Sequence, residues 1–358
     1  MELKKLREQI DNYDVEIIHL LAKRIEASVL SKKLKKQIED KQRETEIFTR
    51  LKDNYSPLVD SQLLKKLFTL IIEHGKTLQN KGLDLIAFQG EHGAYSEVAA
   101  NLWDKDFLTI SCKTFMDVFD KVKLGFCDYG IVPMENSLGG VIGEVNHMLL
   151  DNDMFIVGAV DLHIQHCLLA TKQTNYREIK QVYSHWQALS QCKKFIKRHN
   201  IKAIDYFDTA AAAKYITIKQ EISSAAISSE LSAKYYNLEI VKKGIEDIPS
   251  NITRFLIIAK KRVDSEDANK CSIVFSSATS DKAGSLFKIL KVFADAGLSL
   301  TRLESFPRFD KPGHYAFFVD FIGSDHDKNV KVTLSTVNSI TDSFKFLGCY
   351  KELIDKRN

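Results

Sequence analysis

Several features are missing from this sequence, and each absence excludes a class of protein. No stretch reaches the roughly 18 uninterrupted apolar residues of a membrane span, and no apolar segment follows the charged start MELKKLREQI. The six cysteines form no C-x-x-C pair, which argues against a disulfide or zinc framework and predicts free thiols in a reducing compartment. A net charge of +4, with a basic run at 31–36 that contains no aromatics, does not indicate nucleic-acid binding. We therefore expect a cytoplasmic protein that binds neither membranes nor nucleic acid.

The remaining composition is that of a globular chain of two or three domains, with 358 residues, 44% apolar and 27% charged. Residues 3–36 lack proline and glycine and carry apolar side chains every three or four positions, which predicts one long helix. Shorter helices are predicted at about 41–53 and 60–79, and Gly82 then ends the segment. Residues 1–80 are thus predicted to be all-α.

From residue 83 the pattern changes to short apolar runs alternating with helical stretches. The predicted strands are LDLIAFQG, YGIVPMENS, MFIVGAV, HCLLA, QVYSH and FLIIAK, and the predicted helices include YSEVAANLW and TAAAAKYI. This α/β pattern favours two subdomains with a small-molecule site in the cleft between them.

The polar segment 263–270 is predicted to be a linker to a third domain. Strand-like and helix-like stretches follow it in the order βαββαβ, with helices at about 283–296 and 326–340. Gly297 is placed to end the first of these helices.

One charged residue interrupts the apolar seam of the long helix. Arg24 follows Leu3 at a multiple of seven residues, and a buried arginine is unfavourable unless it meets an anion. It either reaches from the edge of the seam to a neighbouring Glu or binds an anionic ligand. On a continuous helix Lys35 would lie on nearly the same face about 16 Å away, so both cations could contact one dianion. Arg7 would lie about 25 Å from Arg24 and could reach that ligand only from a second subunit.

Residues 1–80 resemble the all-α chorismate mutase family. The resemblance is carried by LREQID at 6–11, LLAKRIE at 20–26, Lys35, DKQRE at 40–44 and LFTLIIEHGKTLQ at 67–79. It implies an intertwined dimer that rearranges chorismate to prephenate without a cofactor or proton transfer, by selecting the reactive conformer and stabilising charge on the ether oxygen.

The mutase resemblance also implies roles for six residues. Arg24, with Arg7 of a second subunit, would hold the two carboxylates of chorismate. Lys35 and Gln79 would donate to the ether oxygen, Glu44 would bind the substrate hydroxyl, and Asp40 would orient it. The chain departs from the family in a shortened segment between residues 35 and 40 and in Gly75, where the family often has a small hydroxyl residue.

The segment PSNITRF at 249–255 is open to three interpretations: a glycosylation acceptor, a turn before a strand, or a ligand-facing pair of Thr253 and Arg254. Together with IAFQGEHGAYSEVAA, YGIVPMENSLGG, VYSHWQALSQC and DTAAAAKY, it resembles the prephenate dehydratase family over residues 84–260. The resemblance implies a two-lobed α/β domain similar to periplasmic binding proteins and favours the ligand-facing interpretation.

By this resemblance Thr253 would donate a hydrogen bond to the hydroxyl that prephenate loses, while Arg254 would either hold a carboxylate or support the loop. Glu135 is either an acid or an ion-pair partner. His185 is either a general acid or a packing residue beside Trp186, which replaces the proline usual in the family. Five polar residues would line the pocket, although each alone is also compatible with a turn or cap: Asn136, Ser137, Ser184, Gln191 and Thr209.

Residues 271–350 resemble the ACT domain, a sensor of small molecules. The resemblance implies that phenylalanine binds at a subunit interface and favours a less active arrangement. Phe287 and Phe306 depart from the motifs of the family, and the alternative is a domain kept for dimerisation alone. The implied effector residues are Gly284, Ser285, Leu286, Glu304 and Ser305.

Together the resemblances predict a mutase domain at 1–80, a two-lobed dehydratase domain at 83–262 and an ACT domain at 270–358. The expected enzyme converts chorismate through prephenate to phenylpyruvate, with feedback by phenylalanine. We expect a homodimer or higher homo-oligomer that uses no metal or other cofactor, because no nucleotide-binding fingerprint or metal cluster is present. The alternatives are an arogenate dehydratase and a non-catalytic amino-acid sensor.

Overall fold

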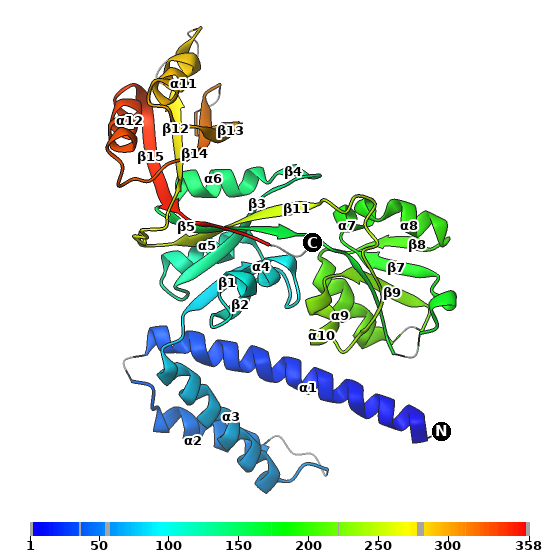
Figure 1. Cartoon of the computed structure of the whole chain (residues 1–358). Coiled ribbons are helices and arrows are strands. Elements are labelled where there is room, and N and C mark those ends of the chain that lie inside the picture. Colours follow the sequence, from blue (N-terminus) through cyan, green and yellow to red (C-terminus); the bar gives the residue numbers. More distant parts are fainter. Residues whose placement is uncertain are drawn as a thin grey trace. The chain divides into compact units, whose positions relative to one another are not determined.

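The computed structural model divides into two compact units, residues 1–85 with 106–110 and residues 86–105 with 111–358 (Figure 1). No helix in the described part of the chain is long and apolar enough to cross a membrane. The described residues are 3–35, 37–53, 58–172, 174–220, 222–277, 283–308, 310–311 and 313–355.

Apart from residues 85 and 108–110, which begin the strands β1 (Leu85–Gln89) and β2 (Leu108–Cys112), the regular elements described in the first unit are helical. They are α1 (Leu3–Ser31), the 3₁₀ turn η1 (Lys32–Leu34), α2 (Lys41–Asp53) and α3 (Ser61–Lys81). Helix α3 begins at the N-cap Asp60, whose side chain accepts from the Leu63 N–H, and ends at Gly82 in the left-handed region (φ 62°). It packs against both α1 and α2. The prediction of an all-α segment is confirmed.

The long helix ends earlier than its apolar pattern predicts. Lys35 has an extended backbone (φ −101°, ψ 143°), so it does not continue the face of α1. The Ser28 carbonyl oxygen accepts from the Ser31 hydroxyl (2.7 Å) and from the Gln79 side-chain amide, bonds that compete with continuation of the helix. The prediction that residues 3–36 form one helix, and the spacing it gave between Arg24 and Lys35, are therefore wrong.

The second unit begins with a lobe built on a seven-stranded mixed sheet in the order β16-β5-β11-β3-β1-β2, with β4 beside β3 (Figure 1). β1 and β3 are parallel, whereas β11 runs antiparallel to both β3 and β5. The strands are β1 (Leu85–Gln89), β2 (Leu108–Cys112), β3 (Tyr129–Asn136), β4 (Gly140–Val141), β5 (Phe155–His163), β11 (Ile252–Ala259) and β16 (Glu352–Ile354). The helices are α4 (Tyr95–Trp103), α5 (Phe115–Lys123) and α6 (Gly143–Asp151).

The chain leaves this lobe after β5 and returns at β11, so two segments connect the lobes. The second lobe has a five-stranded sheet in the order β10-β6-β9-β7-β8. Its elements are β6 (Cys167–Ala170), η2 (Tyr176–Glu178), β7 (Gln181–Ser184), α7 (Trp186–Gln191), α8 (Lys193–Arg198), β8 (Lys202–Asp205), α9 (Thr209–Lys219), β9 (Ser224–Ser228), α10 (Glu230–Tyr235) and β10 (Glu239–Lys243). The predicted two-lobed α/β architecture is confirmed.

The C-terminal part forms an antiparallel sheet in the order β13-β14-β12-β15. Its elements follow the predicted order βαββαβ: β12 (Lys270–Ser277), α11 (Ser285–Asp295), β13 (Leu300–Pro307), β14 (Tyr315–Ile322), α12 (Lys328–Ser339) and β15 (Thr341–Tyr350). Phe275, Phe293 and Phe321 are buried in its core. The final strand, β16, leaves this sheet and pairs in parallel with β5 of the first lobe.

Candidate functional site

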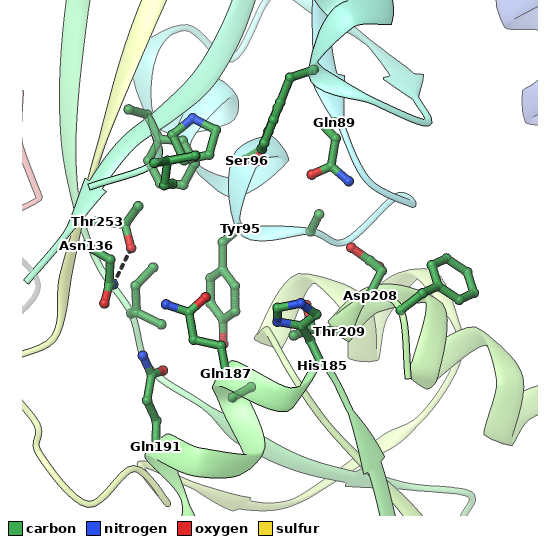
Figure 2. Close-up of a pocket in the computed structure, with 18 of the residues that line it drawn as sticks. Gln89, Tyr95, Ser96, Asn136, His185, Gln187, Gln191, Asp208, Thr209 and Thr253 are labelled. Atoms are coloured by element: carbon green, nitrogen blue, oxygen red, sulfur yellow. Dashed lines mark hydrogen bonds between the residues drawn. The ribbon is translucent and has the colours of Figure 1, made fainter. Parts of the chain in front are cut away.

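A cavity of about 530 Å³ lies in the two-lobed part of the chain and is lined by residues from both lobes (Figure 2). Thr253 stands near the start of β11, with its Cα opposite Asn136 at the end of β3. The polar and charged lining residues are Gln89, Tyr95, Ser96, Lys113, Thr114, Asn136, Glu144, His166, His185, Gln187, Gln191, Asp208, Thr209, Asn251 and Thr253.

The hydroxyl of Thr253 is oriented by Asn136. The Asn136 Oδ1 accepts from the backbone N–H groups of Leu138 (3.1 Å) and Gly139 (2.7 Å), so its amide nitrogen must face the opposite way. That nitrogen donates to Thr253 Oγ1 (2.8 Å, the dashed line in Figure 2) and to Asn251 Oδ1 (2.7 Å). Because the Thr253 oxygen accepts from Asn136, its hydrogen remains available to donate to a ligand in the cavity.

Five helices, α4, α5, α6, α7 and α9, begin at the cavity, and their N-terminal ends favour an anion there. Thr114 caps α5 and Asp208 caps α9 through side-chain bonds, whereas the N-cap of α4, Ala94, supplies none. The first turn of α4 can therefore offer backbone N–H groups to a carboxylate, and Lys113 adds a cation to the lining. Burial raises the pKa of the Asp208 carboxyl, which favours its neutral form beside an anionic ligand.

The cavity collects four of the predicted dehydratase residues: Asn136, Gln191, Thr209 and Thr253. Ser137 and Ser184 do not line it. The Ser137 hydroxyl accepts from the Ile252 N–H (2.9 Å), and the fully buried Ser184 hydroxyl donates to the Ile227 carbonyl oxygen (2.6 Å). The structure therefore corrects the expectation that these two serines line the pocket, and it gives both of them backbone partners.

Arg254 is also absent from the cavity lining. It binds Asp161 through two hydrogen bonds (2.8 and 2.9 Å) and forms an ion pair with Glu352 (2.7 Å). These ion pairs favour the interpretation of Arg254 as a supporting residue over a direct contact to a substrate carboxylate. Glu135 likewise forms an ion pair, with Arg302 at 3.4 Å.

His185 does line the cavity, and its ring lies 5.5 Å from that of Trp186. Burial lowers the pKa of His185, which favours the neutral imidazole. Sequence reasoning missed Tyr95, Lys113, His166 and Asp208. Tyr95 and Asp208 stand where helices begin after strands or loops, a position at which α/β proteins commonly bind ligands, and this signal was available in the sequence.

In the helical unit, Arg24, Glu44 and Gln79 lie on three helices that pack through α3. The Arg24 guanidinium lies 5.5 Å from the centre of the Phe68 ring, and burial lowers its pKa. Glu44 pairs with Lys76 (2.7 Å), and the buried Gln79 donates to the Ser28 carbonyl oxygen.

The other three predicted mutase residues lie at or near the ends of helices. Asp40 accepts from the Arg43 N–H (2.9 Å) as the N-cap of α2, while Lys35 is exposed after the end of α1. Arg7 is exposed near the start of α1, roughly 25 Å along the helix from Arg24. The observed helix thus preserves the argument that Arg7 and Arg24 of one chain cannot share a ligand.

The predicted effector residues lie on two elements of the C-terminal sheet domain. Gly284 is the N-cap of α11 with φ 85°, and Ser285 and Leu286 open that helix. Phe287, which follows Leu286 on α11, has an exposed side chain. Glu304 and Ser305 lie on the edge strand β13.

Comparison with known protein families gives three matches in order along the chain. Residues 6–80 match the model "Chorismate mutase type II", residues 86–263 match "Prephenate dehydratase", and residues 272–334 match "ACT domain". The three matches begin close to the starts of the helical, two-lobed and C-terminal parts, and the last of them ends within α12.

Relatives match over nearly the whole chain. The bifunctional chorismate mutase/prephenate dehydratase of Escherichia coli K12 is 32% identical over 97% of this chain and 96% of its own length. A chloroplastic arogenate dehydratase/prephenate dehydratase of Arabidopsis thaliana is 35% identical over 82% of this chain and 78% of its own.

Solved structures match about three quarters of the chain. A prephenate dehydratase from Arthrobacter aurescens, in complex with L-Phe, is 28% identical with a TM-score of 0.68, over 75% of this chain and 89% of that one. A protein described as a quorum-quenching acylase, GqqA, is 27% identical with a TM-score of 0.70, over 75% of this chain and 98% of that one.

Proposed function

The chain belongs to the bifunctional chorismate mutase/prephenate dehydratase family, and we propose that it converts chorismate to prephenate and prephenate to phenylpyruvate in phenylalanine biosynthesis. The observation that carries the proposal is the oriented Thr253 hydroxyl, which has a hydrogen to donate into a cavity bordered by helix N-termini. We place the enzyme in the cytoplasm, because cysteines without framework spacing suit a reducing compartment.

In the dehydratase reaction the ring C–O bond and the bond to the ring carboxylate both break. Carbon dioxide leaves, its bonding electrons complete the aromatic ring, and the departing hydroxide takes up one proton to become water. Thr253 donates a hydrogen bond to this hydroxyl as negative charge develops on it. A threonine hydroxyl is a weak acid, so Thr253 polarises the leaving group or relays a proton. The first turn of α4, with Lys113, suits the substrate carboxylates.

In the mutase reaction no proton moves, and the site has only to bind the compact conformer and stabilise the ether oxygen. Arg24 is our proposed contact to a carboxylate, Gln79 and Lys35 donate to the ether oxygen, Glu44 binds the substrate hydroxyl, and Asp40 orients the substrate. Arg7 is contributed by a second subunit. The proposed second subunit is supported by exposed apolar side chains of α1, which a second copy of the chain would cover. They include Leu3, Ile10, Tyr13, Ile17 and Leu20.

Phenylalanine is the proposed effector, with Gly284, Ser285, Leu286, Glu304 and Ser305 as its binding residues. The related Arthrobacter structure carries L-Phe, which supports this assignment. Residues of α11 and the edge strand β13 are accessible to a second subunit, so a homodimer or higher homo-oligomer also follows from this part of the proposal.

A second candidate substrate is arogenate, in which an ammonium group replaces the side-chain ketone of prephenate. The cavity lining includes the carboxyl groups of Glu144 and Asp208, either of which could accept from an ammonium. The ratio of kcat/KM for arogenate to that for prephenate decides between the two. A ratio above one would make arogenate the preferred substrate.

The test of the proposed function is to incubate the protein with chorismate and to follow chorismate, prephenate and phenylpyruvate by chromatography. The wild type should form phenylpyruvate, and phenylalanine should reduce its formation. Thr253→Ala should accumulate prephenate, whereas the matched variant Thr253→Ser keeps the hydroxyl and should retain turnover. Arg24→Ala should fail on chorismate yet turn over added prephenate. Loss of both activities in either folded Ala variant would contradict the assignment of separate sites.

A further inference from the structure

A continuous series of side-chain hydrogen bonds leads from Thr253 in the first lobe to His166 at the start of the second. Asn136 joins Thr253 to Asn251 (2.8 and 2.7 Å), and Asn251 Nδ2 lies 3.1 Å from Gln191 Oε1. His166 Nε2 lies 2.8 Å from the same Gln191 oxygen. Gln191 is the last residue of α7, so the series connects both lobes beside the cavity; Figure 2 shows its Asn136–Thr253 bond and the position of Gln191.

The orientation of the Asn136 amide determines which atom donates and which accepts in every bond of this series. The backbone N–H groups at Leu138 and Gly139 make Asn136 Nδ2 a donor, so Asn251 Oδ1 accepts and Asn251 Nδ2 donates. Gln191 Oε1 therefore accepts from Asn251, and as an acceptor it requires a hydrogen on His166 Nε2. No member can rotate its amide without leaving a neighbour unpaired.

The histidine is held in the required tautomer. His166 is 2% exposed, and its Nδ1 lies 2.8 Å from the hydroxyl of Tyr95, which can donate to it. If Nδ1 is protonated, the Tyr95 hydroxyl can instead donate to the Gln165 carbonyl oxygen (3.0 Å). The hydrogen on Nε2 is present in both cases, so the bond to Gln191 does not depend on the charge of the ring.

We propose that His166 is a positioning residue for the dehydratase reaction, which fixes the Thr253 hydroxyl through Gln191, Asn251 and Asn136. The Leu138 and Gly139 N–H groups keep the orientation of the Asn136 amide, but its position also depends on the fully buried Asn251. A freed Gln191 amide can turn and withdraw its oxygen from Asn251 Nδ2, and the shift of Asn251 towards a new partner would displace Asn136 and, with it, the Thr253 hydroxyl. The inference rests on the proposed dehydratase function.

The test compares two amide variants of the full-length protein. In His166→Gln the amide nitrogen reaches the position of Nε2 and can still donate to Gln191, whereas in His166→Asn it reaches only the position of Nδ1. We expect His166→Asn to lower the dehydratase kcat by about 10- to 100-fold, the range of effects that small misplacements produce, with KM within about 3-fold. His166→Gln should stay within about 3-fold of the wild-type kcat. Mutase turnover of chorismate should be unchanged in both and reports correct folding of the helical unit, while the retained KM for prephenate reports an intact cavity.

A second variant keeps the inference testable if His166→Asn folds poorly. Gln191→Leu breaks the same series from the other side and should give a similar selective loss of kcat, and the double variant should lose little more than either single variant. Equal kcat values for the Asn and Gln variants, a change confined to KM, or multiplicative losses in the double variant would each overturn the inference. A wild type that forms no phenylpyruvate would instead remove the proposed function itself.

Discussion

The backbone at Leu138 and Gly139 holds the Asn136 amide in one orientation, and this gives a test by an isosteric change. In Asn136→Asp the carboxylate has no hydrogen for Thr253 or Asn251, and the Thr253 hydroxyl would turn to donate to it instead of to the substrate. We expect the dehydratase kcat to fall by about 100- to 1000-fold, the cost of losing a donor at developing charge. Steady-state kinetics with prephenate measures this, with mutase turnover as the control. A fall of less than 10-fold, which is about 1.4 kcal/mol, would contradict the assigned orientation.

His166 also predicts how stability depends on pH. Burial lowers its pKa below the ordinary value of 6.5, so the unfolded chain binds a proton that the folded chain does not between the lowered pKa and 6.5. The contribution of His166 to stability is therefore present above pH 6.5 and is lost as the pH falls from 6.5 through the lowered pKa of the folded state. The thermal midpoint of the wild type should drop more between pH 7.5 and 5.5 than that of His166→Gln. Parallel curves for the two proteins would contradict this prediction.

At the scale of elements, periodicity predicted the long helices and the strongly apolar strands. It failed where a contact between residues far apart in the sequence determines where an element ends. The seam of α1 continues past Ser31, but the Gln79 side chain, 48 residues from Ser31, binds the backbone of the last turn. Strands β8 and β10 are short and partly exposed, and β9 contains only one large apolar residue, Ile227. None of them therefore carries the apolar run by which the other strands were identified.

The sequence likewise predicted only part of the candidate site. Motifs identified Thr253 and Asn136, which the strands β11 and β3 place opposite each other. Arg254 was left open, although successive side chains of a strand point to opposite faces, and this alternation separates it from Thr253. His166 and Lys113 could not be identified, because they reach the cavity from segments whose convergence only the fold determines.

The contact between α1 and α3 gives a prediction at this scale. A Cβ at Gly75 would lie 2.8 Å from the Ser28 hydroxyl, so the two helices approach closely because residue 75 has no side chain. Gly75→Val places two further methyl groups there and should destabilise the helical unit by about 1–3 kcal/mol, with lower mutase turnover. Glu73→Val, at an exposed position of the same helix, is the control and should change little. Thermal unfolding and mutase kinetics of the full chain measure both, and equal effects of the two variants would contradict the close-packing argument.

At the scale of the whole molecule, the C-terminal sheet domain is joined to the first lobe by more than its linker. β16 adds to the sheet of that lobe, and its Glu352 pairs with both Arg254 of β11 and the buried Lys270 of β12 (2.7 Å each). The Lys345 ammonium donates to the Leu149 carbonyl oxygen (2.8 Å) at the end of α6. The effector domain is therefore bonded to the strands and helix that border the catalytic cavity.

Arg302 of β13 lies where the C-terminal sheet domain contacts the first lobe, a position from which bound phenylalanine could influence the cavity. It is 8% exposed, lies over the Phe318 ring (4.7 Å) and faces Glu135, the residue before Asn136. Its guanidinium nitrogens have no hydrogen-bond partner among the described residues, so replacing it with an apolar side chain should cost little stability. What it does supply is an ion pair between a strand of the effector domain and the strand that ends at Asn136.

Arg302→Met should therefore separate regulation from catalysis. We expect the phenylalanine concentration for half-inhibition to rise by about 5-fold or more, the lower end of typical coupling between sites, because the ion pair that joins the two strands is removed. The dehydratase kcat without phenylalanine should stay within about 3-fold of the wild type, since the bonds that orient Asn136 come from its own lobe. Lys351→Met, which removes an exposed ion pair with Asp267, is the matched control and should leave inhibition unchanged. If the inhibition curve of Arg302→Met superimposes on that of the wild type, this ion pair does not couple the effector site to the cavity. The bonds of β16 and Lys345 would then be the connections between the two domains to test.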